Sequence, residues 1–168
     1  MQVFWLVLLG SIHAHALDTE RRREGEHVYV SAVLPHDPAA VREIFQQHRK
    51  TMKLGSAVRS VEVTPLSNGC SQVIVVNRGF AKDLSYTAER CPTEFGWHSR
   101  MTSSEDFEEH DILWEAKPHA EGSVVSIRVK VALKYPVPKF LVQRIVTAAL
   151  EDTLKKIDKL LSGAVQEP

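Results

Sequence analysis

The sequence predicts an α+β fold in which a curved, seven-stranded antiparallel sheet wraps around one long C-terminal helix, with two short helices between strands one and two. Two observations support this prediction. Segments of alternating apolar and polar residues recur from residue 27 to residue 135, and turn residues separate them. The pattern then changes to helical spacing over residues 138–161. A sheet of that length curls, so the long helix is expected to cover its concave face.

The alternation is clearest in the last expected strand, residues 124–135. One face is dry and the other is wet: the dry face carries Val125, Ile127, Val129, Val131, Leu133 and Tyr135, and the wet face carries Ser126, Arg128, Lys130 and Lys134. Pro136 and Pro138 cannot extend a sheet ladder, and Pro138 suits the first turn of a helix. The apolar stripe of that helix comprises Val142, Val146, Ala149, Leu150, Leu154, Ile157 and Leu161, and Gly163 supplies a stop.

The remaining elements follow in order from residue 27. The first strand covers residues 27–34, and Asp37 is placed to cap a helix that begins at Pro38. A second helical piece is expected from Thr51 to Gly55. Six more strands are then expected at residues 58–66, 70–80, 83–91, 95–104, 110–117 and 124–135.

The charge balance excludes one class of partner. The chain of 168 residues carries 21 Lys and Arg against 21 Asp and Glu, so its formal net charge is zero. A protein that binds nucleic acid is expected to carry a basic stripe. We therefore expect a single globular domain with no nucleic-acid partner.

The N-terminus has the features of a secretory signal. Residues 3–12 are apolar but too few to span a bilayer, and Ala14-His15-Ala16 matches a signal-peptidase site. We assign residues 1–16 to a signal peptide, residues 17–25 to a flexible leader, and the protein to the periplasm or the extracellular space. The lack of a basic residue before the apolar run, and Arg21 to Arg23 after it, leave a cytoplasmic protein as the alternative.

Two stretches near the C-terminus carry a family resemblance. They are Trp114-Glu115-Ala116-Lys117-Pro118, followed by Gly122 and the last strand, and Tyr135-Pro136-Val137-Pro138-Lys139-Phe140-Leu141-Val142. The arrangement resembles the helix-grip fold of the START-like, or Bet v 1-like (SRPBCC), superfamily, which includes lipid-transfer domains, coenzyme Q-binding proteins and polyketide cyclase/dehydrase-like proteins. Residues 26–162 are assigned to this START-like domain and residues 163–168 to a tail. The resemblance implies a cavity for a hydrophobic small molecule or lipid.

Strand parity and helix composition give the candidate lining of that cavity. Small residues in the middle of the long helix predict space where a filled core would place Leu or Phe. The candidates are Tyr86, Trp97, Met101, Trp114, Tyr135, Phe140, Ala148 and Ala149. For the aromatic residues and Met101, ordinary core packing is the alternative. Arg90 falls on the same face of its expected strand as Tyr86, and Arg100 on the same face as His98. Because a one-residue slip in strand register moves every side chain to the other face, solvated side chains are favoured for both arginines.

The two cysteines predict a disulfide. If the strands 70–80 and 83–91 pair around Ala81, residues whose numbers sum to 161 lie opposite each other, and Cys70 and Cys91 have that sum. In an exported protein such a pair would oxidise. Two unpaired thiols are the alternative.

Catalytic and metal-binding signatures are absent from the sequence. It contains no G-x-S-x-G, no phosphate-binding glycine loop with Lys and no H-E-x-x-H, and no histidine pairs with a cysteine at zinc spacing. The acidic run from Glu105 to Asp111 is interpreted as a solvated turn rather than a cation site. We therefore expect no catalytic residue, no metal and no cofactor.

Three functions remain open at this point. The favoured one is a non-catalytic carrier of a lipid, quinone, isoprenoid or polyketide-like molecule, with transient membrane contact. The second is a polyketide cyclase or aldol-type enzyme that uses an inward Glu115 or His98. The third is a protein-interaction module with a filled core and an exposed apolar patch.

Overall fold

The computed structural model describes residues 17–47, 54–55, 57–79 and 82–163. Its helices are α1 (Pro38–Gln46) and α3 (Lys139–Leu161). Its strands are β1 (Thr19–Glu24), β2 (His27–Leu34), β3 (Val58–Pro65), β4 (Ser71–Asn77), β5 (Leu84–Pro92), β6 (Gly96–Ser103), β7 (Phe107–His119) and β8 (Gly122–Leu133). Within these ranges, neither helix has the length and apolar character needed to cross a membrane.

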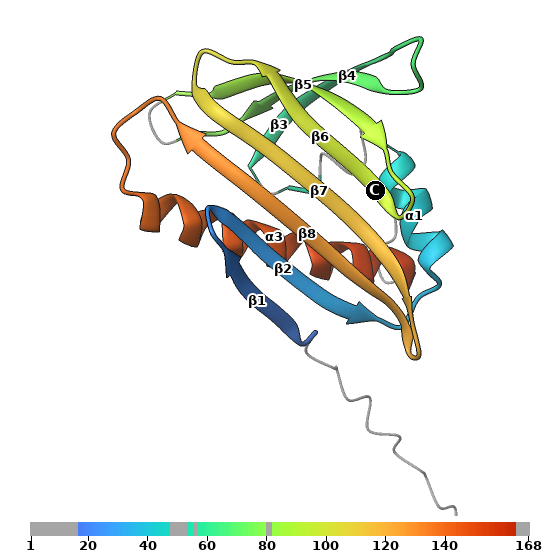
Figure 1. The fold of residues 1–168 in the computed structure, drawn as a ribbon. Helices are drawn as coiled ribbons and strands as arrows, with labels where there is room; N and C mark the ends of the chain where they lie inside the picture. The colour runs from blue at the N-terminus through green and yellow to red at the C-terminus, as the bar shows by residue number, and fades with distance from the viewer. Residues whose placement is uncertain (1–16, 48–53, 56, 80–81, 164–168) are drawn as a thin grey trace, which may run out of the picture.

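All the described strands belong to one antiparallel sheet. Their order is β1-β2-β8-β7-β6-β5-β4-β3, so each of the strands from β3 to β7 pairs with the next one along the chain, and β8 also pairs with β2. Figure 1 shows α3 running along one face of this curved sheet, with α1 near one end. The α+β architecture of an antiparallel sheet on a long C-terminal helix is confirmed.

The strand count and the early helices differ from the prediction. The structure has eight strands, because part of the expected flexible leader forms β1 and pairs antiparallel to β2 at the sheet edge (Figure 1). Five of the six β1 residues are exposed, so the strand shows no apolar alternation. Arg21 forms an ion pair with Glu151 of α3, which ties this edge to the helix. The second expected helix lies largely outside the described residues, and Leu54 and Gly55 form a turn.

Helix α1 closes one end of the sheet. The Asp37 carboxylate accepts a hydrogen bond of 2.6 Å from the Ala39 amide, and Pro38 occupies the first turn, as the sequence predicts. The helix buries Val41 and Phe45, and the Phe45 ring meets the Trp114 ring of β7 edge-on at 5.5 Å.

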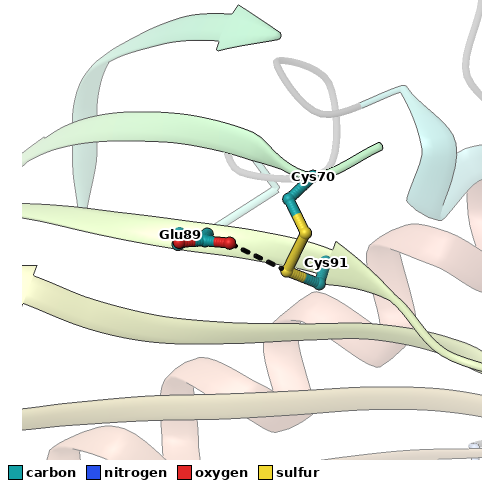
Figure 2. Close-up of side chains that lie close together, drawn as sticks. All are labelled: Cys70, Glu89 and Cys91. Atoms are coloured by element: carbon teal, nitrogen blue, oxygen red, sulfur yellow. Dashed lines mark hydrogen bonds between the residues drawn. A yellow bond between two sulfur atoms is a disulfide. The ribbon is translucent and has the colours of Figure 1, made fainter. Parts of the chain in front are cut away.

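The register of β4 and β5 brings the cysteines together. Ser71 pairs with Arg90, which confirms the predicted sum of 161, and Cys70 and Cys91 form a disulfide with a Cα–Cα distance of 4.3 Å. Figure 2 shows the bond beside Glu89, whose carboxylate oxygen lies 3.4 Å from Cys91 Sγ. Because side chains alternate along a strand, Glu89 and Cys91 lie on the opposite face of β5 from Arg90.

The core consists of two clusters. The larger one joins β2, β7 and β8 to α1 and the second half of α3, and the smaller one joins β3, β4 and β5 to the start of β7. All four buried residues of α3 lie in its second half: Leu150, Thr153, Leu154 and Ile157. The first half of α3 therefore covers the sheet without filling the space beneath it.

Candidate functional site

A cavity of about 480 Å³ lies between the sheet and α3. Its size falls in the range of small-molecule sites, and most of its lining is apolar. The sheet contributes Tyr86, Phe107, His110, Ile112, Trp114, Val129, Val131 and Leu133; the helix contributes Val142, Ile145, Val146, Ala149, Leu150 and Thr153. The remaining described lining residues are Gly55, Ala57, Val58, Asn77, Arg78, Gly79, Leu84 and Val137.

A bulge in β7 shapes the aromatic side of this lining. Side chains at even positions of β7, including His110, Ile112 and Trp114, point toward α3. Phe107 has the opposite parity, yet it lines the same cavity because the register with β8 shifts between Phe107 and Glu109. The bulge therefore brings Phe107 and His110 to one face.

His110 is the most unusual residue of the lining. Its side chain is 8% exposed and its ring stacks on Tyr86, with centroids 4.0 Å apart, while Phe107 meets it edge-on at 5.4 Å. The Nδ1 atom is buried without a hydrogen-bond partner. Burial lowers the pKa of His110 to about 4, so the imidazole is neutral at pH 7.

Tyr86 completes the polar part of the aromatic wall. The side chain is 4% exposed, and its ring contacts the edge of Phe107 at 5.6 Å. Burial raises the pKa of its hydroxyl well above the ordinary value. Tyr86 and His110 therefore both face the cavity as uncharged, polar aromatic groups.

Comparisons with known proteins bear on the fold. No protein-family model matches the sequence, and no curated protein matches it either. A START superfamily protein from Mycobacterium smegmatis aligns with 12% identity and a TM-score of 0.72, over 84% of this chain and 100% of that chain. A STAR-related lipid transfer protein from Xanthomonas axonopodis aligns with 14% identity and a TM-score of 0.66, over 89% of this chain and 95% of that chain. The Zhui aromatase/cyclase from Streptomyces sp. R1128 aligns with 11% identity and a TM-score of 0.63, over 86% of this chain and 94% of that chain. The chain has the START-like fold.

The START-like fold brings three of the expected lining residues together. Tyr86, Trp114 and Ala149 all line the cavity. Ala148 is exposed, contrary to the expectation for it, because it lies about 100° from Ala149 around the helix axis, outside the cavity-facing stripe that contains Val146, Ala149 and Leu150. The expectation that both alanines face the cavity is therefore wrong for Ala148.

The other expected lining residues lie elsewhere. Phe140 is 73% exposed at the start of α3, and Tyr135 is 39% exposed. Trp97 is buried against the larger cluster, where the Arg90 guanidinium lies 5.2 Å from its ring centroid. Met101 packs on the smaller cluster. These four residues are absent from the described lining of the cavity.

Tyr135 takes part in a buried polar contact that the sequence analysis missed. Asp106 is 3% exposed, and its carboxylate accepts hydrogen bonds from the Tyr135 hydroxyl at 2.7 Å and the Ser85 amide at 2.8 Å. Lys82 lies 2.6 Å away, and its ammonium group lowers the pKa of Asp106 to about 2. Asp106 thus joins three chain segments beside cavity residues Leu84 and Leu133, whereas the sequence suggested only a solvated turn.

Arg90 differs from the expectation of a solvated side chain. It is 1% exposed, and its Nη2 donates a hydrogen bond of 2.7 Å to the Phe45 carbonyl oxygen at the end of α1. Nε and Nη1 are buried without partners, and burial lowers the pKa of Arg90 to about 10. Arg90 lies outside the described cavity lining, and Arg100 is exposed as expected.

The two residues that were singled out for an enzyme do not face the cavity. His98 Nε2 lies 2.8 Å from Asp111 Oδ2, and Glu115 pairs with Lys117 at 3.1 Å. Both residues alternate with cavity-facing or buried neighbours, so they lie on the outer face of the sheet. Among the histidines that the structure describes, His110 is the one that lines the cavity. Its even parity with Trp114 was the sequence signal for it.

One group of described residues, Cys70, Glu89 and Cys91, has potential metal-ligating atoms within 4.8 Å of one another (Figure 2). Its two sulfur atoms are bonded to each other, and a thiolate rather than a disulfide sulfur is the metal ligand. In the oxidised protein this group therefore offers a metal only the Glu89 carboxylate.

Proposed function

We propose that the protein binds a hydrophobic small molecule, such as a lipid, quinone, isoprenoid or polyketide-like compound, in the cavity beneath α3. The observation that carries the proposal is the cavity itself, about 480 Å³ in volume and lined mainly by apolar side chains. Similar structures include a lipid transfer protein and an aromatase/cyclase, which supports an apolar ligand.

The chemistry of the lining favours binding over turnover. A general base works best with a pKa near the working pH, and His110, with a pKa of about 4, is a weak base at pH 7. Tyr86 is a poor acid because burial raises its pKa. A polyketide cyclase would therefore depend on two groups that are badly tuned for proton transfer. The cavity likewise argues against an interaction module, which predicts a filled core.

The helix offers a matched pair of variants for testing the proposal. Ala149→Phe places a ring in the cavity, whereas Ala148→Phe places the same ring on the exposed side of α3. We expect the neutral fluorophore N-phenyl-1-naphthylamine to bind the unaltered protein and Ala148→Phe alike, and Ala149→Phe at least tenfold more weakly. Fluorescence titration measures both affinities. Equal losses in the two variants, or no uptake by the unaltered protein, would overturn the proposal.

Export is part of the same proposal. Residues 1–16, the expected signal peptide, lie outside the described part of the chain, but the Cys70–Cys91 bond supports an oxidising compartment. Intact mass spectrometry of the protein from its own host is expected to show a chain that begins near Leu17 and lacks two thiol protons. An intact Met1 in the cytoplasmic fraction would contradict export.

Transient membrane contact would let such a carrier exchange its ligand. The start of α3 exposes Phe140, Leu141 and Ile145, and Lys139 and Arg144 are exposed beside them. Apolar side chains flanked by cations suit an anionic lipid surface. Ile145 also lines the cavity, so the proposed contact surface adjoins the ligand. Cosedimentation with phosphatidylserine vesicles, compared with phosphatidylcholine vesicles, tests this contact.

A further inference from the structure

We propose that the cavity selects neutral apolar molecules that carry a hydroxyl group, an alcohol or a phenol, and that His110 Nδ1 is the atom that recognises this group. The inference rests on the binding function proposed above and narrows its ligand class.

His110 Nδ1 is buried without a hydrogen bond, in a side chain that is more than nine-tenths buried and lines the cavity. Buried polar groups are almost always paired, and leaving one unpaired costs free energy. The two rings that contact the imidazole, Tyr86 and Phe107, meet it through their faces and edges and leave Nδ1 unpaired. The missing partner is therefore expected to come from the cavity.

The opposite wall cannot supply it either. Helix α3 contributes one polar side chain to the described lining, Thr153, and its hydroxyl already donates a hydrogen bond of 2.8 Å to the Ala149 carbonyl oxygen. The neighbouring helical residues Val146, Ala149 and Leu150 are apolar. A ligand group is thus the natural partner for Nδ1.

The chemistry of imidazole selects a hydroxyl group. A neutral imidazole carries its proton on one ring nitrogen, so Nδ1 acts either as an acceptor or as a donor. A hydroxyl group satisfies both cases because it donates and accepts, whereas an ether or a ketone can only accept. With its proton on Nε2, the His110 ring would accept a hydrogen bond at Nδ1 from an alcohol or a phenol. An ether or a ketone has no proton to donate to it.

The charges around the cavity disfavour an anionic group next to His110. Within the described lining there is no Asp, Glu or Lys, and the single Arg, Arg78, is exposed on the segment after β4. Burial also keeps His110 itself uncharged at neutral pH. A carboxylate that entered as far as His110 would lose its hydration without gaining a counter-charge, which is strongly unfavourable. A neutral hydroxyl compound avoids this cost.

Three compounds that share a biphenyl skeleton separate these possibilities: 4-phenylphenol, 4-methoxybiphenyl and biphenyl-4-carboxylate. Each is used to displace N-phenyl-1-naphthylamine from the full mature protein at pH 7.5. We expect the phenol to bind about tenfold more tightly than the methyl ether, and the carboxylate to bind most weakly. In His110→Phe, which keeps a ring against Tyr86, the phenol and the ether should bind within about twofold of each other.

Two further variants make the result specific to Nδ1. His98→Phe makes the same substitution on the outer face of the sheet, so the tenfold preference should persist. His110→Asn retains a polar atom near the cavity and should keep a preference for the phenol. Near-ultraviolet circular dichroism checks that each variant is folded.

The outcomes separate this inference from the proposed function. If the fluorophore binds but the unaltered protein does not prefer the phenol, or if His110→Phe retains the full preference, the hydroxyl selectivity is wrong while hydrophobic binding stands. Tightest binding of the carboxylate would also overturn it. If the fluorophore does not bind at all, the proposed function fails, and the inference fails with it.

Discussion

The two halves of α3 have different neighbours. Residues 150–161 contain every buried side chain of the helix, and Leu154 and Ile157 are completely buried in the larger core cluster. Residues 139–149 contain none, and Phe140 and Ile145 are 73% and 43% exposed. One continuous helix therefore anchors the fold with its second half, and its first half contributes four of the six helical residues that line the cavity.

Polar contacts reinforce the same division. In the second half, Asp158 lies 2.9 Å from His36 Nε2, and Lys156 Nζ donates a hydrogen bond of 3.1 Å to the Leu54 carbonyl oxygen. In the first half, Gln143 accepts a hydrogen bond from Arg23 of the edge strand β1. A segment with few buried contacts opens locally at lower free energy than a segment of the core. The difference shows how the fold can hold a cavity without losing its anchor.

The comparison is tested most strongly by truncating one side chain in each half. Leu154→Ala removes a fully buried side chain from the larger cluster and is expected to lower the free energy of unfolding by about 3 kcal/mol. Val142→Ala removes a half-buried side chain above the cavity and should cost less than about 1 kcal/mol, because its neighbours already leave space. Urea unfolding followed by circular dichroism measures both values.

Similar costs for the two substitutions would contradict this division of the helix. The control is Ala148→Phe, an exposed position in the first half, which should leave the urea midpoint nearly unchanged. A large loss in that variant would mean that the roof of the cavity is packed more tightly than the structure indicates.

Much of this architecture follows from periodicity in the sequence. Alternation gave the strands from β2 to β8, and the 3.6-residue period gave α3, because both patterns record which face is buried. The β4–β5 register also followed, since few residues separate the two strands and their pairing fixed the positions of Cys70 and Cys91. Strand β1 could not be found in this way because it is an exposed edge strand held by backbone pairing, not by an apolar face.

The site was less predictable because it depends on local irregularities. The bulge after Phe107 lets residues of opposite parity share the cavity, and no alternation pattern encodes it. Whether Ala148 or Ala149 faces the cavity depends on how α3 is rotated about its own axis on the sheet, and the sequence does not give that rotation. Asp106 is buried only through partners at Ser85, Lys82 and Tyr135, which lie more than twenty residues away.

A smaller effect on stability is expected from pH, through His110 in the lining of the cavity that the first half of α3 covers. The second half packs on apolar residues such as Val30 and Ile127, whereas most of the first half's inward residues line the cavity that also contains His110. The pKa of His110 is lowered to about 4 by burial, from an ordinary value of about 6.5. As the pH falls below about 6.5 the unfolded chain binds this proton first, so stability is lost until the folded protein also binds it near pH 4.

We therefore expect His110 alone to remove about 2 kcal/mol of unfolding free energy between pH 7.5 and pH 5. Other groups also titrate in this range, so the quantity to measure is the difference between the unaltered protein and His110→Phe. Urea unfolding at several pH values should show that the variant loses less stability on acidification. Parallel pH profiles would mean that water or a ligand solvates His110, and that the wall beneath the first half of α3 is wetter than the wall beneath the second.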